Sequence, residues 1–266
     1  MIDTPFGAPV DEVPLVRSPL VSVIAQVRFP AVVSIQAETG FLAPFQEALR
    51  QAYPVLRQER QMQVLVGPAG GVPQDAGVIW RFEQQDPDAW QVTLASSFVS
   101  LSARRYTSRS DFVSRLTVVL HALDSWLRPK VCDRIGVRYV DRVTGQGLDE
   151  LPRLVRGDVL GIVGQPAFNS DSEVVHTLTD ALFRLPDSSE MRARWGVMPS
   201  GATYDAGIEP SNERSWLLDL DRYRSEPEDF DLAAIAGTVG AYCEDIYRFF
   251  RWVVTDDFLD TYGAQR

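Results

Sequence analysis

Two long segments of this 266-residue chain have apolar residues at helical spacing, and they constrain the fold more than any other feature. The spacing predicts a helix over 110–127, capped by Ser110 or Asp111, and a second helix over 231–252. Gly237 and Gly240 lie inside the second helix, where glycine is unfavourable, so we interpret them as points of close packing on a sheet.

Shorter segments alternate apolar and polar residues, as expected of strands with one buried face. The predicted strands cover 20–29, 62–66, 78–84, 90–94, 98–106, 134–143, 174–185, 191–197 and 215–223. A short helix is predicted over 40–52, helical structure over 148–160, and a turn over the GPAGGVP segment at 67–73.

The predicted elements occur twice in the same order: strand, helix, several antiparallel strands, long helix. We therefore expect an α+β fold built by duplication, with two antiparallel sheets that are each backed by long helices. The expected organisation is an extended arm over 1–19, a first half over 20–130 and a second half over 131–266.

Charge is unevenly distributed along the chain, whose formal net charge is −10. Residues 101–150 hold nine bases and six acids, whereas residues 201–266 hold six bases and fourteen acids. An acidic chain disfavours non-specific binding to a nucleic acid. The first residues lack the basic start of a signal peptide, and no apolar run approaches membrane-spanning length, so a cytoplasmic location without membrane contact is expected.

Residue patterns that mark common catalytic or cofactor sites are missing from the sequence. His121, His176, Cys132 and Cys243 stand apart from one another and form no zinc-binding spacing. No glycine-rich loop leads into a helix with the lysine of a phosphate-binding loop. We therefore expect no cofactor and lean against an enzyme.

Two acids on one predicted strand are the candidate metal ligands. Asp219 and Asp221 lie two residues apart in the LLDLDRY segment, so their carboxylates share a face of the strand. Such a pair can bind a divalent metal ion. The alternative is cross-strand pairing with arginines such as Arg192 and Arg194, which also alternate on a strand.

Four arginines surround the start of the helix over 110–127 and form the candidate anion-binding site. They are Arg104, Arg105, Arg109 and Arg115. A helix N-terminus beside guanidinium groups can hold a phosphate or an acidic protein surface. The alternative is a basic loop that is neutralised by the acidic end of the chain.

Several segments together resemble a sporadically distributed bacterial protein family whose members have no agreed activity. They are PLVSVIAQVRFP, FQEALRQAYP, VIWRF, GVRYVDRV, LLDLDRY and the closing helix, and the resemblance covers roughly residues 15–260. Its patchy distribution implies an antitoxin-like or immunity-like role. The repeated order of elements is also similar to the saddle of TATA-binding proteins and to helix-grip layouts.

These observations lead us to expect a non-enzymatic binding protein that recognises a protein partner. One alternative is a protein or enzyme that binds a small anion or nucleotide through the arginines and the aspartate pair. Another is a protein that binds single-stranded nucleic acid on a curved sheet, which the net charge disfavours.

Overall fold

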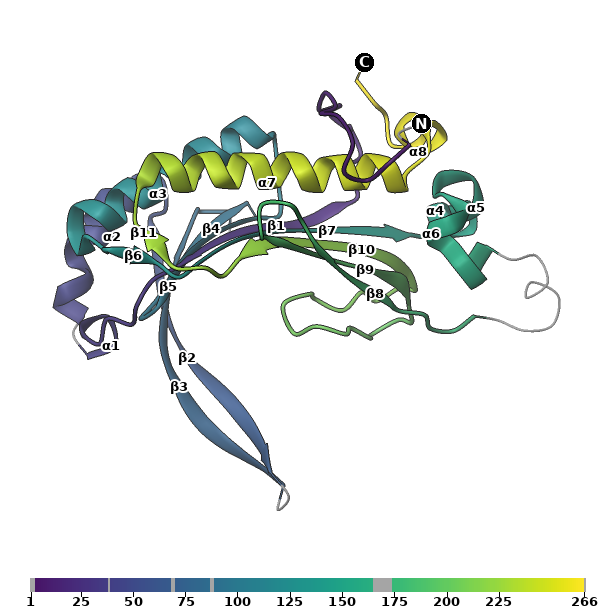
Figure 1. Ribbon diagram of the computed structural model, residues 1–266. Helices are drawn as coiled ribbons and strands as arrows, with labels where there is room; N and C mark the ends of the chain where they lie inside the picture. The colour runs from purple at the N-terminus through teal and green to yellow at the C-terminus, as the bar shows by residue number, and fades with distance from the viewer. Residues whose placement is uncertain (1–2, 38, 68–69, 87–88, 165–173, 266) are drawn as a thin grey trace. The chain divides into compact units, whose positions relative to one another are not determined.

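A computed structural model describes residues 3–37, 39–67, 70–86, 89–164 and 174–265. The protein is a mixed α+β structure with a large antiparallel sheet and several helices (Figure 1). The strands follow the order β2-β3-β4-β5-β1-β7-β10-β9-β8. No helix in these residues is both long and apolar enough to cross a bilayer.

The chain divides into two compact units, and the division falls inside four elements. Unit 1 contains residues 1–23, 138–223 and 241–266, and unit 2 contains residues 24–137 and 224–240. The boundaries therefore cut strands β1 (Leu20–Arg28), β7 (Arg134–Thr144) and β10 (Ser215–Arg224) and helix α7 (Leu232–Val253).

Unit 2 is built on an antiparallel meander whose strands are joined by turns. Its members are β2 (Val55–Gly67), β3 (Gly70–Glu83), β4 (Trp90–Ala95) and β5 (Phe98–Ala103). The hairpin of β2 and β3 extends away from the helices of this unit (Figure 1). A small ladder pairs β6 (Val131–Cys132) with β11 (Glu228–Asp229).

The helices of unit 2 bury an aromatic core against this meander. They are α1 (Ser34–Ala37), the 3-10 helix η1 (Thr39–Leu42), α2 (Ala43–Leu49) and α3 (Arg109–Leu127). The ring centroid of Phe45 in α2 lies 5.3 Å from that of Phe82 in β3, and Phe112 in α3 lies 5.9 Å from Trp90 in β4. These edge and tilted contacts explain why the aromatic residues of α2 and α3 face inward.

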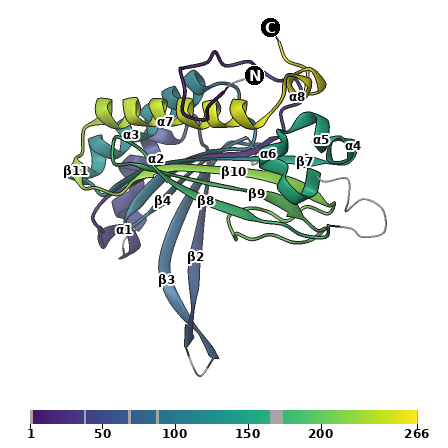
Figure 2. The same ribbon diagram turned by 45° about the vertical axis from the view of Figure 1, so that its right-hand side comes forward.

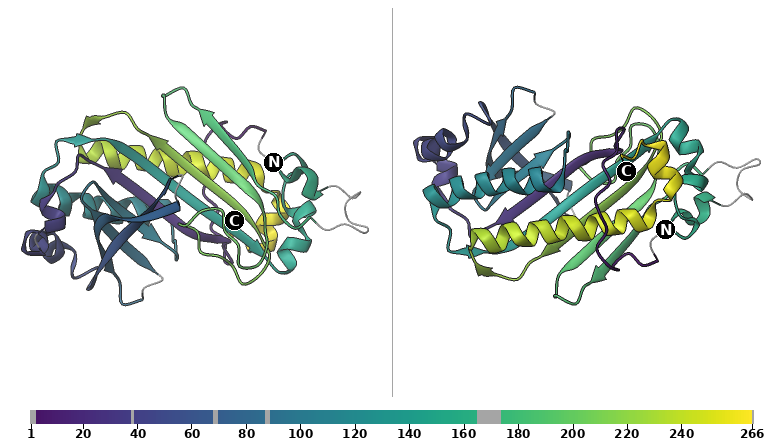
Figure 3. Two further views of the ribbon diagram at one scale, coloured as in Figure 1. Left: turned by 90° about the horizontal axis from the view of Figure 1, so that it is seen from below. Right: turned by 90° about the horizontal axis from the view of Figure 1, so that it is seen from above.

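Unit 1 contains the second antiparallel meander, with β8 (Thr179–Arg184), β9 (Glu190–Met198) and β10 (Ser215–Arg224). Figure 3 shows these three green strands side by side, with β8 outermost. Short helices follow β7 or close the chain: α4 (Gln146–Asp149), α5 (Leu151–Leu154), α6 (Gly157–Leu160), the 3-10 helix η2 (Gly161–Gly164) and α8 (Asp256–Thr261).

Both faces of the unit 1 strands are covered, by different kinds of structure. Arg222 of β10 contacts Tyr242 and Asp245, so one face meets the end of α7 (Figure 2). The loop over 199–214 covers the opposite face. There Ile208 packs in a buried cluster with Val140, Met198 and Leu217.

The predicted helices and strands are present, with shifts at their ends that have physical causes. β2 begins at Val55 rather than at residue 62, because the polar residues 57–61 hide the strand pattern and are held by cross-strand ion pairs such as Arg57–Glu83. The predicted strand over 98–106 ends at Ala103. The turn predicted over 67–73 falls partly on 68–69, outside the described residues, and β3 already begins at Gly70.

Two local predictions are wrong. The N-cap of α3 is Ser108, whose hydroxyl accepts a hydrogen bond from the Asp111 backbone N–H at 3.2 Å; the predicted caps lie inside the helix. Gly237 is not a point of close packing, because a Cβ atom there meets nothing within 4 Å. The nearest atom to a Cβ at Gly240 is a methyl of Val113 in α3, at 4.0 Å.

Gly196 of β9 is the glycine that a close approach requires. A Cβ there would lie 2.0 Å from the carbonyl oxygen of Thr177, just before β8. Gly196→Ala should push this segment off β9 and lower the free energy of unfolding by about 1–3 kcal/mol. In urea denaturation, Gly237→Ala is the matched control and should raise stability by up to about 1 kcal/mol. Equal effects of the two substitutions would contradict this account.

Candidate functional site

The four predicted anion-binding arginines lie around the first turns of α3 in unit 2, and two of them are paired with acids. Arg105 Nη1 lies 2.5 Å from Asp86 Oδ2 on the surface. Arg115 Nε donates to both oxygens of Asp111, at 3.0 and 3.1 Å, and its guanidinium lies 4.5 Å from the Trp90 ring centroid.

The start of α3 already has the groups that satisfy a helix N-terminus. Ser108 caps the Asp111 N–H, and the Asp111 carboxylate supplies negative charge in the first turn. Arg104 and Arg109 lie beside this turn, with the Arg104 backbone N–H donating to Ala89 O at 3.2 Å. The cluster thus has acidic partners of its own from the same unit.

The aspartate pair lies on β10 in unit 1, and its members are opposite the two predicted arginines of β9. Asp219 is opposite Arg194, and Asp221 is opposite Arg192. Asp219 is only 1% exposed. A carboxylate at this depth requires a compensating charge.

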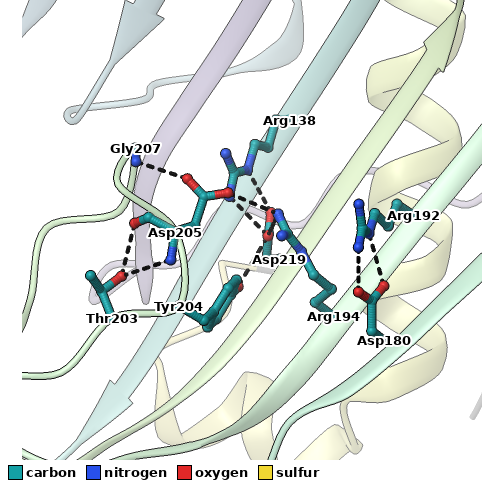
Figure 4. A network of polar contacts seen from close by, with 9 residues as sticks. All are labelled: Arg138, Asp180, Arg192, Arg194, Thr203, Tyr204, Asp205, Gly207 and Asp219. Atoms are coloured by element: carbon teal, nitrogen blue, oxygen red, sulfur yellow. Dashed lines mark hydrogen bonds and ion pairs between the residues drawn. The ribbon is translucent and has the colours of Figure 1, made fainter. Parts of the chain in front are cut away.

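Asp219 receives that compensation from two arginines on neighbouring strands (Figure 4). Arg138 of β7 makes a bidentate contact, with Nε 2.8 Å from Oδ1 and Nη2 3.0 Å from Oδ2. Arg194 Nη2 lies 2.6 Å from Oδ2. The cross-strand pairing that was the alternative to a metal site is therefore what Asp219 makes.

The loop over 199–214 completes this network. Tyr204 donates its hydroxyl to Asp219 Oδ2 at 3.0 Å, and Asp205 lies 3.0 Å from Arg138 and 3.3 Å from Arg194. The other Asp205 oxygen accepts the Gly207 N–H at 2.8 Å (Figure 4). The Arg194 guanidinium also lies 4.9 Å from the Tyr204 ring centroid. We call these five side chains, Arg138, Arg194, Tyr204, Asp205 and Asp219, the Asp219 network.

The pKa values within the Asp219 network follow from burial and mutual attraction. Burial disfavours the charged form of Arg138, but Asp219 and Asp205 outweigh it and raise its pKa. Burial raises the pKa of Tyr204, and the neighbouring Asp219 charge raises it further. Burial opposes the charged form of Asp205, but hydrogen bonds and the arginines lower its pKa. Arg138 and Asp205 are therefore held in their charged forms, and Tyr204 in its neutral form, at neutral pH.

This arrangement is chemically closed. Its carboxylates already accept hydrogen bonds from guanidinium groups, a phenol and a backbone N–H. Within the described parts of the chain, no group of three or more histidine, cysteine, aspartate or glutamate residues could hold a metal ion. We interpret the Asp219 network as a structural contact that holds the loop over 199–214 against the sheet.

The edge of unit 1 carries a different and more open feature, which sequence reasoning missed. Strand β8 is the terminal strand of the sheet order. Leu182 on this strand is 58% exposed. Leu178 and Val175, which precede the strand, are 39% and 60% exposed. Clusters of exposed apolar side chains on a surface mark interaction sites more often than isolated ones do.

The backbone of β8 also has hydrogen-bonding groups directed away from the sheet. Thr177 N–H donates to Val197 O and Leu185 N–H donates to Ser189 O, so the odd-numbered residues bond to β9. Asp180, Leu182 and Arg184 consequently point their N–H and C=O groups outward. Among the residues that the structure describes, these outward groups have no hydrogen-bond partner.

A second feature that sequence reasoning missed is a buried acid in β7. Asp141 is 6% exposed and alternates with the buried Tyr139 and Val143. Its side chain makes no hydrogen bond or ion pair with any described residue, and burial raises its pKa to about 7. The sequence signal was present, since the GVRYVDRV segment places an acid in an otherwise apolar alternating series.

Comparisons with family models, with curated proteins and with solved structures find no match to this chain. The resemblance to a sporadic bacterial family therefore stays a prediction. Function must be argued from the surfaces described above.

Removing the Asp219 carboxylate should strongly destabilise unit 1. Asp219→Asn leaves Arg138 and Arg194 buried without this partner, at a cost of about 3–5 kcal/mol. The control is Asp180→Asn, which breaks an exposed pair with Arg192 and should cost less than about 1 kcal/mol. Chemical denaturation followed by tryptophan fluorescence measures the free energy of unfolding of both variants. A small effect of Asp219→Asn would contradict the structural role of the Asp219 network.

Asp141 should make stability fall as pH rises. The unfolded carboxyl loses its proton near pH 4, whereas the folded one keeps it until about pH 7. The penalty is therefore absent below pH 4, grows between pH 4 and 7, and is constant above. Asp141→Asn should have a free energy of unfolding a few kcal/mol higher than that of the native chain at pH 8, and nearly the same one at pH 4. Denaturation series at both pH values test this, and a pH-independent difference would contradict it.

Proposed function

We propose that this chain is a non-enzymatic binding protein that recognises a protein partner, and that the outer edge of β8 is its recognition element. The observation that carries the proposal is the combination of outward backbone groups on β8 with the exposed Leu182 on the strand and Leu178 just before it. Partners that add a strand gain main-chain hydrogen bonds, and the side chains of the edge strand supply specificity.

The charges beside the edge support protein recognition over binding of a small anion. Asp180 and Arg192 form an exposed pair on this face, and Arg184 is 82% exposed at the end of the strand. A mixed polar rim around an apolar centre is the usual composition of a protein interface. The arginines of α3 support the anion-binding alternative less well, because Arg105 and Arg115 already contact Asp86 and Asp111.

Three further elements belong to this proposal. The resemblance to the sporadic bacterial family supports an antitoxin-like or immunity-like role. A cytoplasmic location is part of the same proposal. Internal duplication with the saddle-like or helix-grip layout fits the antiparallel meander that each unit contains.

Substitution of Leu182 should abolish partner binding. We expect purification from the native host under gentle salt, followed by intact mass spectrometry, to recover a second polypeptide with the native chain. Leu182→Lys should lose it, because a charge replaces the apolar centre of the edge. Val118→Lys is the matched control, since Val118 is 51% exposed on α3 in the other unit. Equal recovery with both variants, or a polypeptide missing from all samples, would contradict the proposal.

A further inference from the structure

The edge of β8 has a sequence that is complementary to itself. Asp180 and Arg184 lie symmetrically about Leu182, and all three side chains alternate onto the same face of the strand. If two β8 strands run antiparallel with Leu182 opposite Leu182, each Asp180 is opposite Arg184 of the second copy. Opposite charges in direct cross-strand positions stabilise a pair of strands, and like charges destabilise it.

The outward backbone groups fit the same register. Asp180, Leu182 and Arg184 are the residues whose N–H and C=O groups point away from β9. In the register centred on Leu182, each of them meets another outward-pointing residue, so every cross-strand pair among them is a hydrogen-bonded pair. A shift by one residue would bring outward groups against residues that are already bonded to β9.

Burial of apolar surface adds to these bonds. The two Leu182 side chains, each 58% exposed in a single copy, come into direct contact at the two-fold axis. Pro186 follows the strand and has no N–H, which limits the pairing to the segment around Leu182. The other face of β8 is covered within its own unit. There the ring centroid of Phe183 lies 5.4 Å from that of Phe6 and 5.8 Å from that of Phe249.

We propose that a second copy of this chain binds the β8 edge, with the two β8 strands antiparallel and Leu182 on the two-fold axis. The proposal rests on the proposed function in that it uses the same edge. It names the partner as a second copy and fixes the register of the contact.

A cysteine placed at the axis tests the register. Hydrogen-bonded antiparallel residues have Cα atoms about 5.5 Å apart, which is within the range that a disulfide bridges. Leu182→Cys should therefore form a disulfide-linked dimer under mild oxidation. In the same register, Leu178 of one copy is about 27 Å from Leu178 of the other, so Leu178→Cys should stay monomeric on a denaturing gel. The native Cys132 and Cys243 are both buried.

Sedimentation of the native chain over a concentration series should show a dimer. Arg184→Asp should weaken this dimer at least tenfold, because two pairs of carboxylates then face each other, and adding Asp180→Arg should restore it. Equal cross-linking of the two cysteine variants, or a native chain that is monomeric at every concentration, would overturn the self-pairing.

The two proposals fail in different ways. A monomeric native chain that still loses a recovered polypeptide on Leu182→Lys overturns the self-pairing and supports the edge as a site for another protein. A dimer with the expected cross-link and no other polypeptide supports the self-pairing and overturns recognition of a different partner.

Discussion

The buried carboxylate of Asp219 is the interaction on which one face of unit 1 depends. Its two guanidinium partners come from β7 and β9, on either side of β10, so the charge is satisfied only when these strands keep their order and register. A slip of one residue would turn Asp219 toward the face that α7 covers. The same carboxylate accepts the Tyr204 hydroxyl, which ties a sixteen-residue loop, 199–214, to the sheet.

The balance of forces in the Asp219 network favours a structural role for these side chains. Each buried charge loses the favourable free energy of hydration. Several short hydrogen bonds that reinforce one another within the network compensate for this loss. Both Asp219 oxygens and the nearer Asp205 oxygen already face guanidinium groups. Binding a metal ion would require two arginines to leave a carboxylate that is 1% exposed.

The sequence could predict the elements because their periodicities are local. The helix over 110–127 and the strand over 134–143 have helical and alternating patterns of apolar residues, so the order of these residues reveals both elements within one or two residues. The loop over 199–214 has no such period. Its position depends on Tyr204 and Asp205 meeting side chains from three strands, which no local pattern encodes.

The candidate site follows the same division between local and distant information. The common face of Asp219 and Asp221, and their positions opposite arginines, could be inferred from alternation along two strands. That β8 is the terminal strand could not, because sheet order is set by contacts between distant segments. Alternation places Leu182 on the same face of the sheet as Asp219, but no local pattern shows that the loop over 199–214 leaves this residue 58% exposed.

Regional charge was also a poor guide to the surface, for a physical reason. The acidic residues of 201–266 include Asp205, Asp219 and Asp245, which bind Arg138, Arg194, Arg222 and Arg248 inside unit 1. A sum over sequence counts such buried charges with those that meet solvent. Long-range attraction depends on the solvent-facing part, and buried pairs contribute little to it.

The remaining charges on β8 show how position decides what an edge strand does. Charged side chains on an edge normally prevent two sheets from joining. Asp180 and Arg184 have opposite signs and flank Leu182 at equal distances along the strand, so an antiparallel copy meets attraction where a parallel or shifted copy meets mismatch. The same two residues therefore oppose indiscriminate association and permit one defined register.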